Sequence, residues 1–395
     1  MKRYYLTTVA VSLAVLLCFS FIYDVWHGAD ADPVLRVGFI YENDESTPYT
    51  YNFFIAQDAL EKQYRDQVRV MTRSNVMADE TDGPLRELVK HGCRIVFINS
   101  YSEQVLPVAR EFPDVQFCQV SFAGAFSQDR PANYHTFNGE IYQGRYVSGV
   151  VAGMKLRQLI DGGDLAPEEA LVGFVGAFPS AEVISGYTAF LLGVRAAAPE
   201  AVMRVRYTGT WSSYTQEKAC AKKLIDEGCV IIAQHTDTIG PAVACEEASA
   251  DRKVYHIGYH QSMIDVAPNS SLITAHVDWT PYLTGAVAAV LAGRPIESVV
   301  AGTVHGTDLS AGFDKGWVEM LDLNAPIAAE GTQDKVNQLI EAFQKGRQEV
   351  FQGDYVGVDR DNPSDTCDLS QGYTENKDSS TATFHYVLRD VITEE

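Results

Sequence analysis

Basic residues are scarce in this chain of 395 residues. Lysine and arginine together number 31 against 52 aspartates and glutamates, which gives a formal net charge of -21 at pH 7. A surface of this charge is repelled by a phosphate backbone, so the composition argues against nucleic acid as a partner. The acidity is typical of a protein that stays soluble in a salty or extracellular setting.

The chain also lacks the signature motifs of common enzyme classes. The strand-like stretches VGFI, at residues 37–40, and VGFV, at residues 172–175, are each followed by a turn without GxGxxG, so no dinucleotide-binding loop is expected. GxSxG and GxxxxGK[ST] do not occur. His235 and Asp237 are two residues apart, but no nucleophile, base and orienting group come together around them. We therefore expect no catalytic residues and no cofactor.

Metal-ligand spacings are missing as well. No CxxC pair occurs, and His256, His260 and His276 do not show the spacing of a zinc site. We expect these histidines to be ordinary hydrogen-bonded residues and predict no metal site.

The cysteines number seven and are dispersed along the chain. Cys93 and Cys229 open strand-like apolar runs, which predicts small buried hydrophobic residues. Cys220 and Cys245 lie on neighbouring predicted helices, and a disulfide between them is a hypothesis for an oxidising compartment.

The chain begins with a segment typical of export. Two basic residues precede the run Leu6–Tyr23, which carries no charge. Three outcomes are open for residues 1–31: cleavage of a signal peptide after Ala31, retention as a membrane anchor, or lipidation at Cys18, which Leu17 disfavours. Each outcome places the body of the protein outside the cytoplasm, in a periplasm or on the outer face of the cytoplasmic membrane.

The sequence contains an internal repeat. GCRIVFINSYS at residues 92–102 returns as GCVIIAQHTDT at residues 228–238, and each copy follows an amphipathic run that stops at a glycine. VGFI and VGFV are separated by nearly the same offset. Helix, buried strand and loop therefore occur twice, which predicts an α/β protein with two similar doubly wound lobes.

Two lobes of this kind offer a ligand one preferred place, the crevice beyond the carboxyl ends of their parallel strands. The loops predicted there carry many aromatic and small polar residues; they lie at residues 41–52, 99–102, 176–182, 208–214, 234–238 and 259–263. Aromatic faces stack on planar rings, each contributing about 1–3 kcal/mol by analogy with base stacking. A carboxylate accepts hydrogen bonds from ring N–H or amino groups. Trp211 and Asp237 are the strongest candidates for these roles, whereas any single tyrosine can equally serve to pack a loop onto its lobe.

The order of several segments carries a resemblance to a known family. The segments are LVKHGCRIVFINSYSEQVLPVAREFPDVQF from Leu88, FNGEIYQGRYVSGVVAGM from Phe137, VGFVGAFPSAEVISGYTAFLLGVRAAAP from Val172, TGTW ending at Trp211, KKLIDEGCVIIAQHTDT from Lys222 and LITAHVDWTPY from Leu272. With them, the chain from about Leu35 to Gly353 resembles the basic membrane protein family of ABC-transporter substrate-binding proteins. These are purine and purine-nucleoside binders with the type I periplasmic-binding fold.

The resemblance implies roles for particular residues. Trp211 is expected to stack on the ring from the second lobe, Asp237 to anchor the base, and Tyr49 to cover the opposite face. The pocket is expected to be lined also by Phe178, Asn99, Ser100 and Tyr101. Tyr49 stands in TPYTY where the nucleobase branch shows a tryptophan in a GWTY-like stretch, and the SFN of the nucleoside branch is missing. A tyrosine at this position can still stack on a ring, and the missing SFN counts against tight recognition of a ribose.

The resemblance also implies a hinge of three crossings between the lobes, near Asn138, Thr274 and Ala301. The first lobe is then residues 33–138 with about 275–300, and the second is residues 139–274 with about 301–355. Residues 359–395 are polar and acidic in their first part, so we expect an acidic, flexible C-terminal tail.

The leading expectation is a solute-binding protein of an ABC importer that takes a purine nucleobase or nucleoside and delivers it to the permease and ATPase subunits. One alternative is a membrane-anchored ligand sensor of the same fold. Another is an enzyme that processes nucleosides in the same crevice, which the missing catalytic motifs disfavour.

Overall fold

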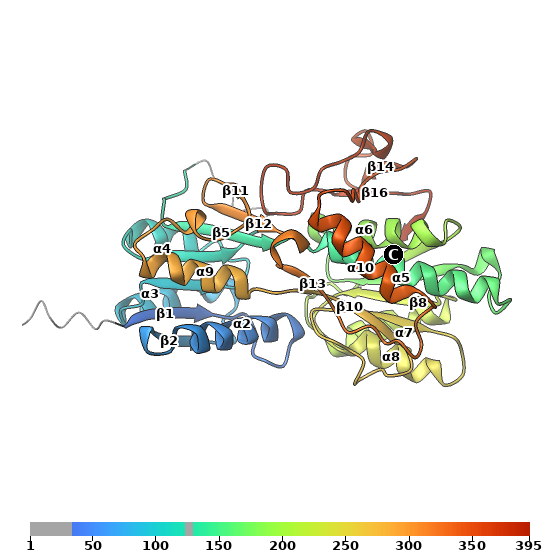
Figure 1. Ribbon diagram of the computed structural model, residues 1–395, viewed down its shortest axis with the longest axis horizontal. Helices are drawn as coiled ribbons and strands as arrows, with labels where there is room; N and C mark the ends of the chain where they lie inside the picture. Colours follow the sequence, from blue (N-terminus) through green and yellow to red (C-terminus); the bar gives the residue numbers. More distant parts are fainter. Residues whose placement is uncertain (1–33, 123–128) are drawn as a thin grey trace, which may run out of the picture.

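The computed structural model describes residues 34–122 and 129–395 (Figure 1). The run Leu6–Tyr23, the cleavage position after Ala31 and the lipidation position Cys18 lie outside the described residues. No helix within the described ranges combines the length and the apolar character that a membrane crossing requires.

The described residues form two seven-stranded sheets that lie at opposite ends of an elongated molecule (Figure 1). The first sheet has the order β11-β12-β5-β4-β3-β1-β2 and the second has the order β13-β10-β9-β8-β6-β7-β17. The strands of the first sheet are β1 (Leu35–Ile40), β2 (Val68–Arg73), β3 (Ile95–Ile98), β4 (Gln116–Val120), β5 (Tyr134–Gly139), β11 (Thr303–His305) and β12 (Asp308–Ala311). Those of the second are β6 (Leu171–Gly176), β7 (Val202–Tyr207), β8 (Ile231–His235), β9 (Tyr255–Tyr259), β10 (Ser271–Val277), β13 (Val318–Leu321) and β17 (Ile392–Glu394).

The two sheets repeat one topology, as the internal repeat predicts. Parallel strands β5-β4-β3-β1-β2 of the first sheet correspond in order to β10-β9-β8-β6-β7 of the second. The glycines that open the repeated motif adopt positive φ in both copies, 84° at Gly92 and 97° at Gly228. This left-handed conformation is easily reached only by glycine, and it ends each helix before the next buried strand.

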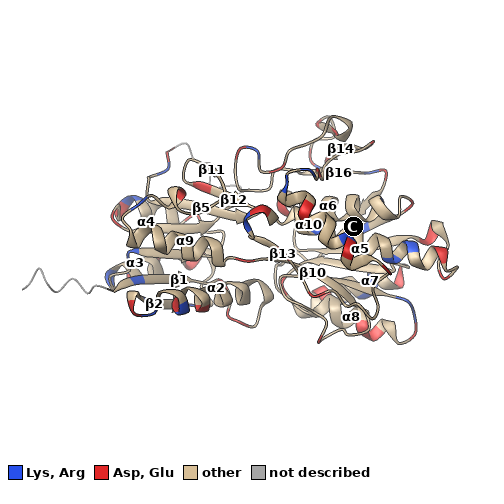
Figure 2. Ribbon diagram, in the orientation of Figure 1, with Lys and Arg blue, Asp and Glu red and all other residues tan. Residues whose placement is uncertain are grey.

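Helices cover both faces of each sheet. In the first lobe α2 and α9 pack together on one face and α3 and α4 lie on the other; in the second lobe α5 and α6 lie opposite α7 and α8. The helices are α2 (Pro48–Tyr64), α3 (Asp82–Lys90), α4 (Val105–Glu111), α5 (Tyr142–Asp161), α6 (Ala181–Ala197), α7 (Tyr214–Asp226), α8 (Gly240–Ser249), α9 (Thr280–Leu291) and α10 (Thr332–Gln344). Strands β3, β4, β6, β8 and β9 contain no charged residue, as parallel strands buried on both faces require, and Figure 2 shows the charges mainly on helices and connections.

The chain passes between the two sheets at three places, so the predicted doubly wound lobes with a three-crossing hinge are confirmed. The crossings lead from β5 to α5, from β10 to α9 and from β12 to β13. The third crossing differs from the expectation near Ala301. Residues 303–311 form the hairpin β11–β12, and β12 pairs in parallel with β5, so this stretch belongs to the first sheet and the chain crosses only afterwards.

The C-terminal segment is folded, which corrects the prediction of a flexible tail. It forms a small sheet of β14 (Val356–Asp359), β15 (Thr366–Asp368) and β16 (Tyr386–Val387), and β17 joins the second sheet beside β7. Although the segment is polar on average, its few apolar side chains are buried; they include Leu369, Phe384, Val387, Leu388 and Ile392. Composition alone misled the prediction because this segment completes a core that the lobes supply.

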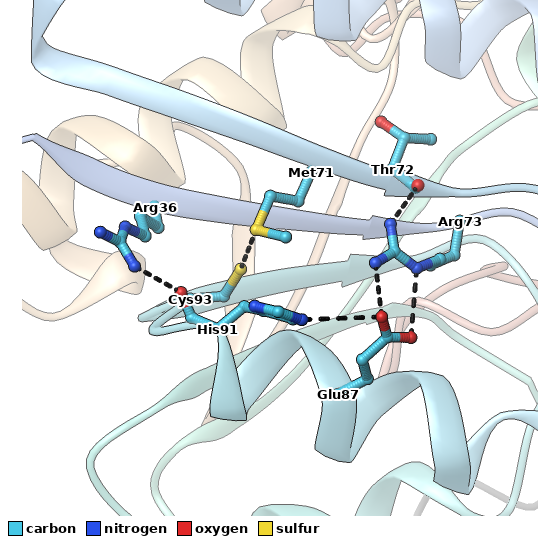
Figure 3. A network of polar contacts seen from close by, with 7 residues as sticks. All are labelled: Arg36, Met71, Thr72, Arg73, Glu87, His91 and Cys93. Carbon is cyan, nitrogen blue, oxygen red and sulfur yellow. Dashed lines mark hydrogen bonds and ion pairs between the residues drawn. The ribbon is translucent and has the colours of Figure 1, made fainter.

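The six cysteines within residues 34–122 and 129–395 are free thiols. Cys93 and Cys229 are buried as predicted, and the Cys93 sulfur lies 3.9 Å from that of Met71 inside the first lobe, beside the ion pair of Arg73 with Glu87 (Figure 3). The hypothesis of a disulfide between Cys220 and Cys245 is wrong for this structure. Cys245 packs into the apolar cluster between β6, β8 and helices α7 and α8, and Cys220 packs against that cluster as a thiol.

Candidate functional site

A pocket lies between the lobes, beyond the carboxyl ends of the parallel strands. Its space between atoms, part of it open to solvent, is about 360 Å³. The lining residues are Glu42, Tyr49, Asn99 and Tyr101 from the first lobe, and Glu182, Trp211, His235, Asp237, Tyr259 and His260 from the second.

Tyr49 stands on the first turn of α2 and not in a loop, because Pro48 is already helical. The first position of a helix favours proline, because a backbone N–H there has no hydrogen-bond partner within the helix. The Tyr49 hydroxyl donates a 2.7 Å hydrogen bond to the carbonyl of Asn99. Its ring lies 5.3 Å from that of His260, which belongs to the other lobe. Tyr49 therefore lines the pocket in a fixed orientation.

Asn99 is buried and holds the first-lobe loops together. Its side-chain oxygen accepts a 2.8 Å hydrogen bond from the backbone N–H of Glu42. This bond couples the loop after β1 to the loop after β3. Asn99 thus positions Glu42 and Tyr49, in addition to lining the pocket.

Ser100 and Tyr101 follow Asn99 but differ in placement. Ser100 is fully buried, and its carbonyl accepts a 2.8 Å hydrogen bond from Gln119, so it does not line the pocket. The Tyr101 hydroxyl donates a 2.7 Å hydrogen bond to Glu182, on the first turn of α6. This bond spans the cleft from the first lobe to the second.

Trp211 and Asp237 come from adjacent loops of the second lobe. The backbone N–H of Asp237 donates a 2.9 Å hydrogen bond to the carbonyl of Trp211. The fully buried Glu217 accepts hydrogen bonds from the backbone N–H groups of Ser213, at 2.9 Å, and of Thr238, at 3.1 Å. A buried carboxylate thereby joins the two loops, which places the indole and the Asp237 carboxyl in the same pocket.

Phe178 stands at the rim. It is 37% exposed and is not part of the pocket lining, and its ring centroid lies 5.8 Å from that of Trp211 in an edge-to-face arrangement. Phe178 therefore supports Trp211 from outside the pocket.

The second-lobe wall of the pocket is built by Tyr259 and His260 at the end of β9. Their rings lie 3.5 Å apart, and the guanidinium of the buried Arg145 lies 3.7 Å from the centroid of the Tyr259 ring. His260 has a φ of 64°, an uncommon conformation for a residue other than glycine. Its side-chain Nδ1 lies 3.3 Å from the amide nitrogen of Asn52 in the first lobe. Such outliers cluster at binding sites, and here the strained residue spans the cleft.

The ionisable groups of the pocket are perturbed by burial. Burial, with the neighbouring carboxyl of Glu217, raises the pKa of Asp237 well above its ordinary value. Burial also raises the pKa of Glu42. Burial, with the positive charge of Arg145, lowers the pKa of His235 to about 4, so this imidazole is neutral at pH 7.

Five lining residues were not among the predicted site residues: Glu42, Glu182, His235, Tyr259 and His260. Each lies at the end of a parallel strand, in the connection that follows one or, for Glu182, on the first turn of the next helix. This position is the signal that could have identified them. The sequence prediction gave most weight to aromatic residues such as Trp211, so it omitted charged residues and histidines at the same loops.

Comparison with known proteins identifies the family. The model of the PnrA-like ABC transporter substrate-binding proteins matches residues 47–348. A protein of Brucella abortus named as a purine-binding protein is 30% identical over 269 residues, which cover 67% of this chain and 71% of that protein. A protein of Haloferax volcanii, provisionally named as an ABC transporter glucose-binding protein, is 27% identical over 300 residues, 75% of this chain and 69% of that protein.

The fold is shared with solved solute-binding proteins. An ABC transporter solute-binding protein of Conexibacter woesei superposes with a TM-score of 0.58 at 22% identity and covers 80% of this chain and 98% of its own. The structure and the family match lead to the same conclusion. The chain has two lobes of like topology, a hinge of three crossings and a pocket between the lobes, and the family match covers most of the chain. The chain belongs to the PnrA-like family of ABC transporter substrate-binding proteins, an extracytoplasmic family of small-molecule binders.

Proposed function

We propose that this protein binds a purine or a related flat heterocycle between its lobes and delivers it to the permease and ATPase subunits of an ABC importer. Trp211 stacks on the ring, Tyr49 or Tyr101 bounds it from the first lobe, and Asp237 accepts hydrogen bonds from its N–H or amino groups. The observation that carries this proposal is the convergence of the indole and a buried carboxyl in one interlobe pocket.

Aromatic density in the pocket favours a flat ligand. The Trp211 ring meets Tyr101 from the first lobe at 6.2 Å, in an edge-to-face arrangement. The indole therefore lies among aromatic rings, which are surroundings that favour a planar ligand ring. The name of the Brucella relative, a purine-binding protein, is consistent with such a ligand.

Contacts across the cleft supply a mechanism for signalling the bound state. Tyr101 bonds to Glu182, and Asn52 lies against His260, so both lobes contribute to one closed arrangement. A ligand that contacts both lobes shifts the population toward this arrangement. The closed form is then the one that a permease recognises.

The alternatives are a sugar ligand, which the name of one relative favours, and a sensor function. A sugar also presents hydroxyl donors to carboxylates and a face to aromatic rings, and the Haloferax relative is named for glucose. A membrane-anchored sensor would use the same closure to signal to a partner protein; a gene for a histidine kinase beside this one, in place of permease and ATPase genes, would favour it.

The first experiment is mass spectrometry of the small molecule released when purified residues 32–395 are denatured. Lobes that enclose a ligand retain it through purification, so we expect a purine or related heterocycle in the extract. Ligand-depleted protein is then titrated with adenine, hypoxanthine, adenosine and glucose while tryptophan fluorescence is recorded. A response to glucose and none to any purine would contradict the proposal.

A further inference from the structure

Three carboxyl groups converge on the pocket from three separate elements. Glu42 follows β1, Glu182 lies on the first turn of α6, and Asp237 follows β8. Asp237 is 6% exposed and the Glu182 side chain is 24% exposed, so water screens these groups only partly. Among the described residues that line the pocket, none is lysine or arginine.

Few cations act on these carboxyls, and burial raises the pKa of Asp237, so Glu42 and Glu182 are the carboxyls considered as charges. Through its positive charge the buried Arg145 acts to lower the pKa of Glu182, and that of Asp237 against the larger effect of burial. It stacks on Tyr259, donates a 2.7 Å hydrogen bond to the carbonyl of Gln234 and does not line the pocket. Burial lowers the pKa of both His235 and His260, which keeps the two imidazoles neutral. The charge of Arg145 therefore acts on Asp237 and Glu182, whereas the pKa of Glu42 is raised by burial.

Aromatic rings surround the same space. Tyr49, Tyr101, Trp211 and Tyr259 all line the pocket, and the faces of such rings carry negative potential. Aromatic faces attract an organic cation electrostatically, and nearby carboxylates add to that attraction. The same surroundings repel a phosphate or a carboxylate on a ligand.

We propose that the pocket selects a heterocycle that carries a positive charge, a protonated or N-alkylated amino-substituted ring, over neutral rings of the same shape, and that it excludes anions such as nucleotides. This inference rests on the heterocycle-binding function proposed above and specifies the charge of the ligand. Glu42 and Glu182 are the residues that impose the selection, and the aromatic rings supply affinity for any flat ring.

Two ligands of similar outline compare a cation with a neutral ring, and the variants below separate charge from hydrogen bonding. In one mildly acidic buffer 1-methyladenine is a cation, whereas 1-methylhypoxanthine has nearly the same outline and is neutral. We expect the cation to bind about tenfold more tightly or better, as measured by calorimetry on ligand-depleted residues 32–395. Adenosine 5′-monophosphate, which carries a phosphate, is expected not to bind.

Matched variants identify the residues responsible. Glu42→Gln and Glu182→Gln remove one charge each with little change of shape, and each is expected to reduce the cation-to-neutral affinity ratio about threefold or more. Glu45→Gln is the control, because Glu45 is exposed on the same loop as Glu42 and does not line the pocket. It is expected to leave the ratio unchanged.

The outcomes separate this inference from the proposed function. Equal binding of the two methylated rings, or tighter binding of the neutral one, would overturn the charge selection while purine binding stands. An equal loss of both ligands in the Glu→Gln variants would show a structural role for those residues and would also overturn it. Binding of glucose and of none of the purines would instead overturn the proposed function.

Discussion

The buried position of Asp237 lowers the stability of the folded protein. Its carboxyl is buried beside other carboxyls, and burial raises its pKa well above the ordinary value. Above the ordinary aspartate pKa of about 4, the unfolded chain has lost this proton while the folded protein retains it. The folded state then binds more protons, so the free energy of unfolding falls as the pH rises from that value to the raised pKa.

Asp237→Asn is therefore expected to have opposite effects on stability and binding. Without ligand, the free energy of unfolding at pH 7 should rise, because no buried carboxyl has to hold a proton or bear a charge, and its decline with pH should become shallower. Affinity should fall by about 2 kcal/mol or more, since a charge-assisted hydrogen bond is lost. Urea unfolding at several pH values and ligand titration measure both; lower stability with unchanged affinity would contradict the assigned role.

Trp211 is expected to contribute to ligand affinity through stacking, independently of Asp237. Trp211→Ala is expected to weaken ligand binding by about 1–3 kcal/mol, the range of stacking on an aromatic face. Phe178→Ala is the comparison, because Phe178 contacts Trp211 from the rim and does not line the pocket. Calorimetric titration should show a smaller loss for it; equal losses would indicate that the two rings act as one structural unit.

The crossing of α5 and α6 sets the geometry of the second lobe. A Cβ placed on Gly149 would lie 2.1 Å from the carbonyl oxygen of Phe190, and one on Gly193 would lie 2.1 Å from that of Tyr146. Only glycine permits two helix backbones to approach this closely. Because α6 begins beside the pocket and carries Glu182 on its first turn, this close packing also positions a pocket residue.

Gly149→Ala is expected to lower the free energy of unfolding by about 1–3 kcal/mol, because the helices must separate to admit the methyl group. Gly83→Ala is the matched control, since Gly83 lies in α3 with no atom within 4 Å of an added Cβ. It is expected to stabilise the protein by up to about 1 kcal/mol through helix propensity. Equal effects of the two changes, measured by urea unfolding, would rule out the close-packing explanation.

At the scale of the whole molecule, the C-terminal segment connects the two lobes. The backbone N–H of Ser380 donates a 2.7 Å hydrogen bond to Asp308 on β12 of the first sheet. Further along, β17 pairs in parallel with β7 of the second sheet, and the buried Ile392 packs into the large core. The C-terminal segment is therefore part of the folded protein, although it lies outside residues 47–348, which match the family.

Ile392→Ala and Thr393→Ala test this docking. Ile392 is 3% exposed, so its truncation should lower the free energy of unfolding by about 2–5 kcal/mol. Thr393 is an exposed neighbour on the same strand, and its replacement should change the value by no more than about 0.5 kcal/mol. A flexible tail would make both substitutions neutral in a thermal or urea unfolding experiment.

The site residues differ in how far the sequence could predict them. Trp211 and Asp237 follow repeated strands, and local pattern sufficed to place both at the crevice. Ser100 follows the strand equivalent to the one before Asp237, but its side chain is buried inside the first lobe. Which residue of a loop faces the crevice depends on the turn of the backbone, and a pattern of residue types does not specify that turn.

The duplicated α/β lobes follow from the sequence alone, because patterns a few residues long encode alternating helices and buried strands. The same patterns locate the edge of the sheets at which the pocket lies, because parallel strands end together. The meeting of Glu42 with Glu182 and Asp237, the bond from Tyr101 across the cleft and the docking of β17 depend on the tertiary structure. Those contacts join residues far apart in the chain, and packing of the two lobes, not local preference, brings them together.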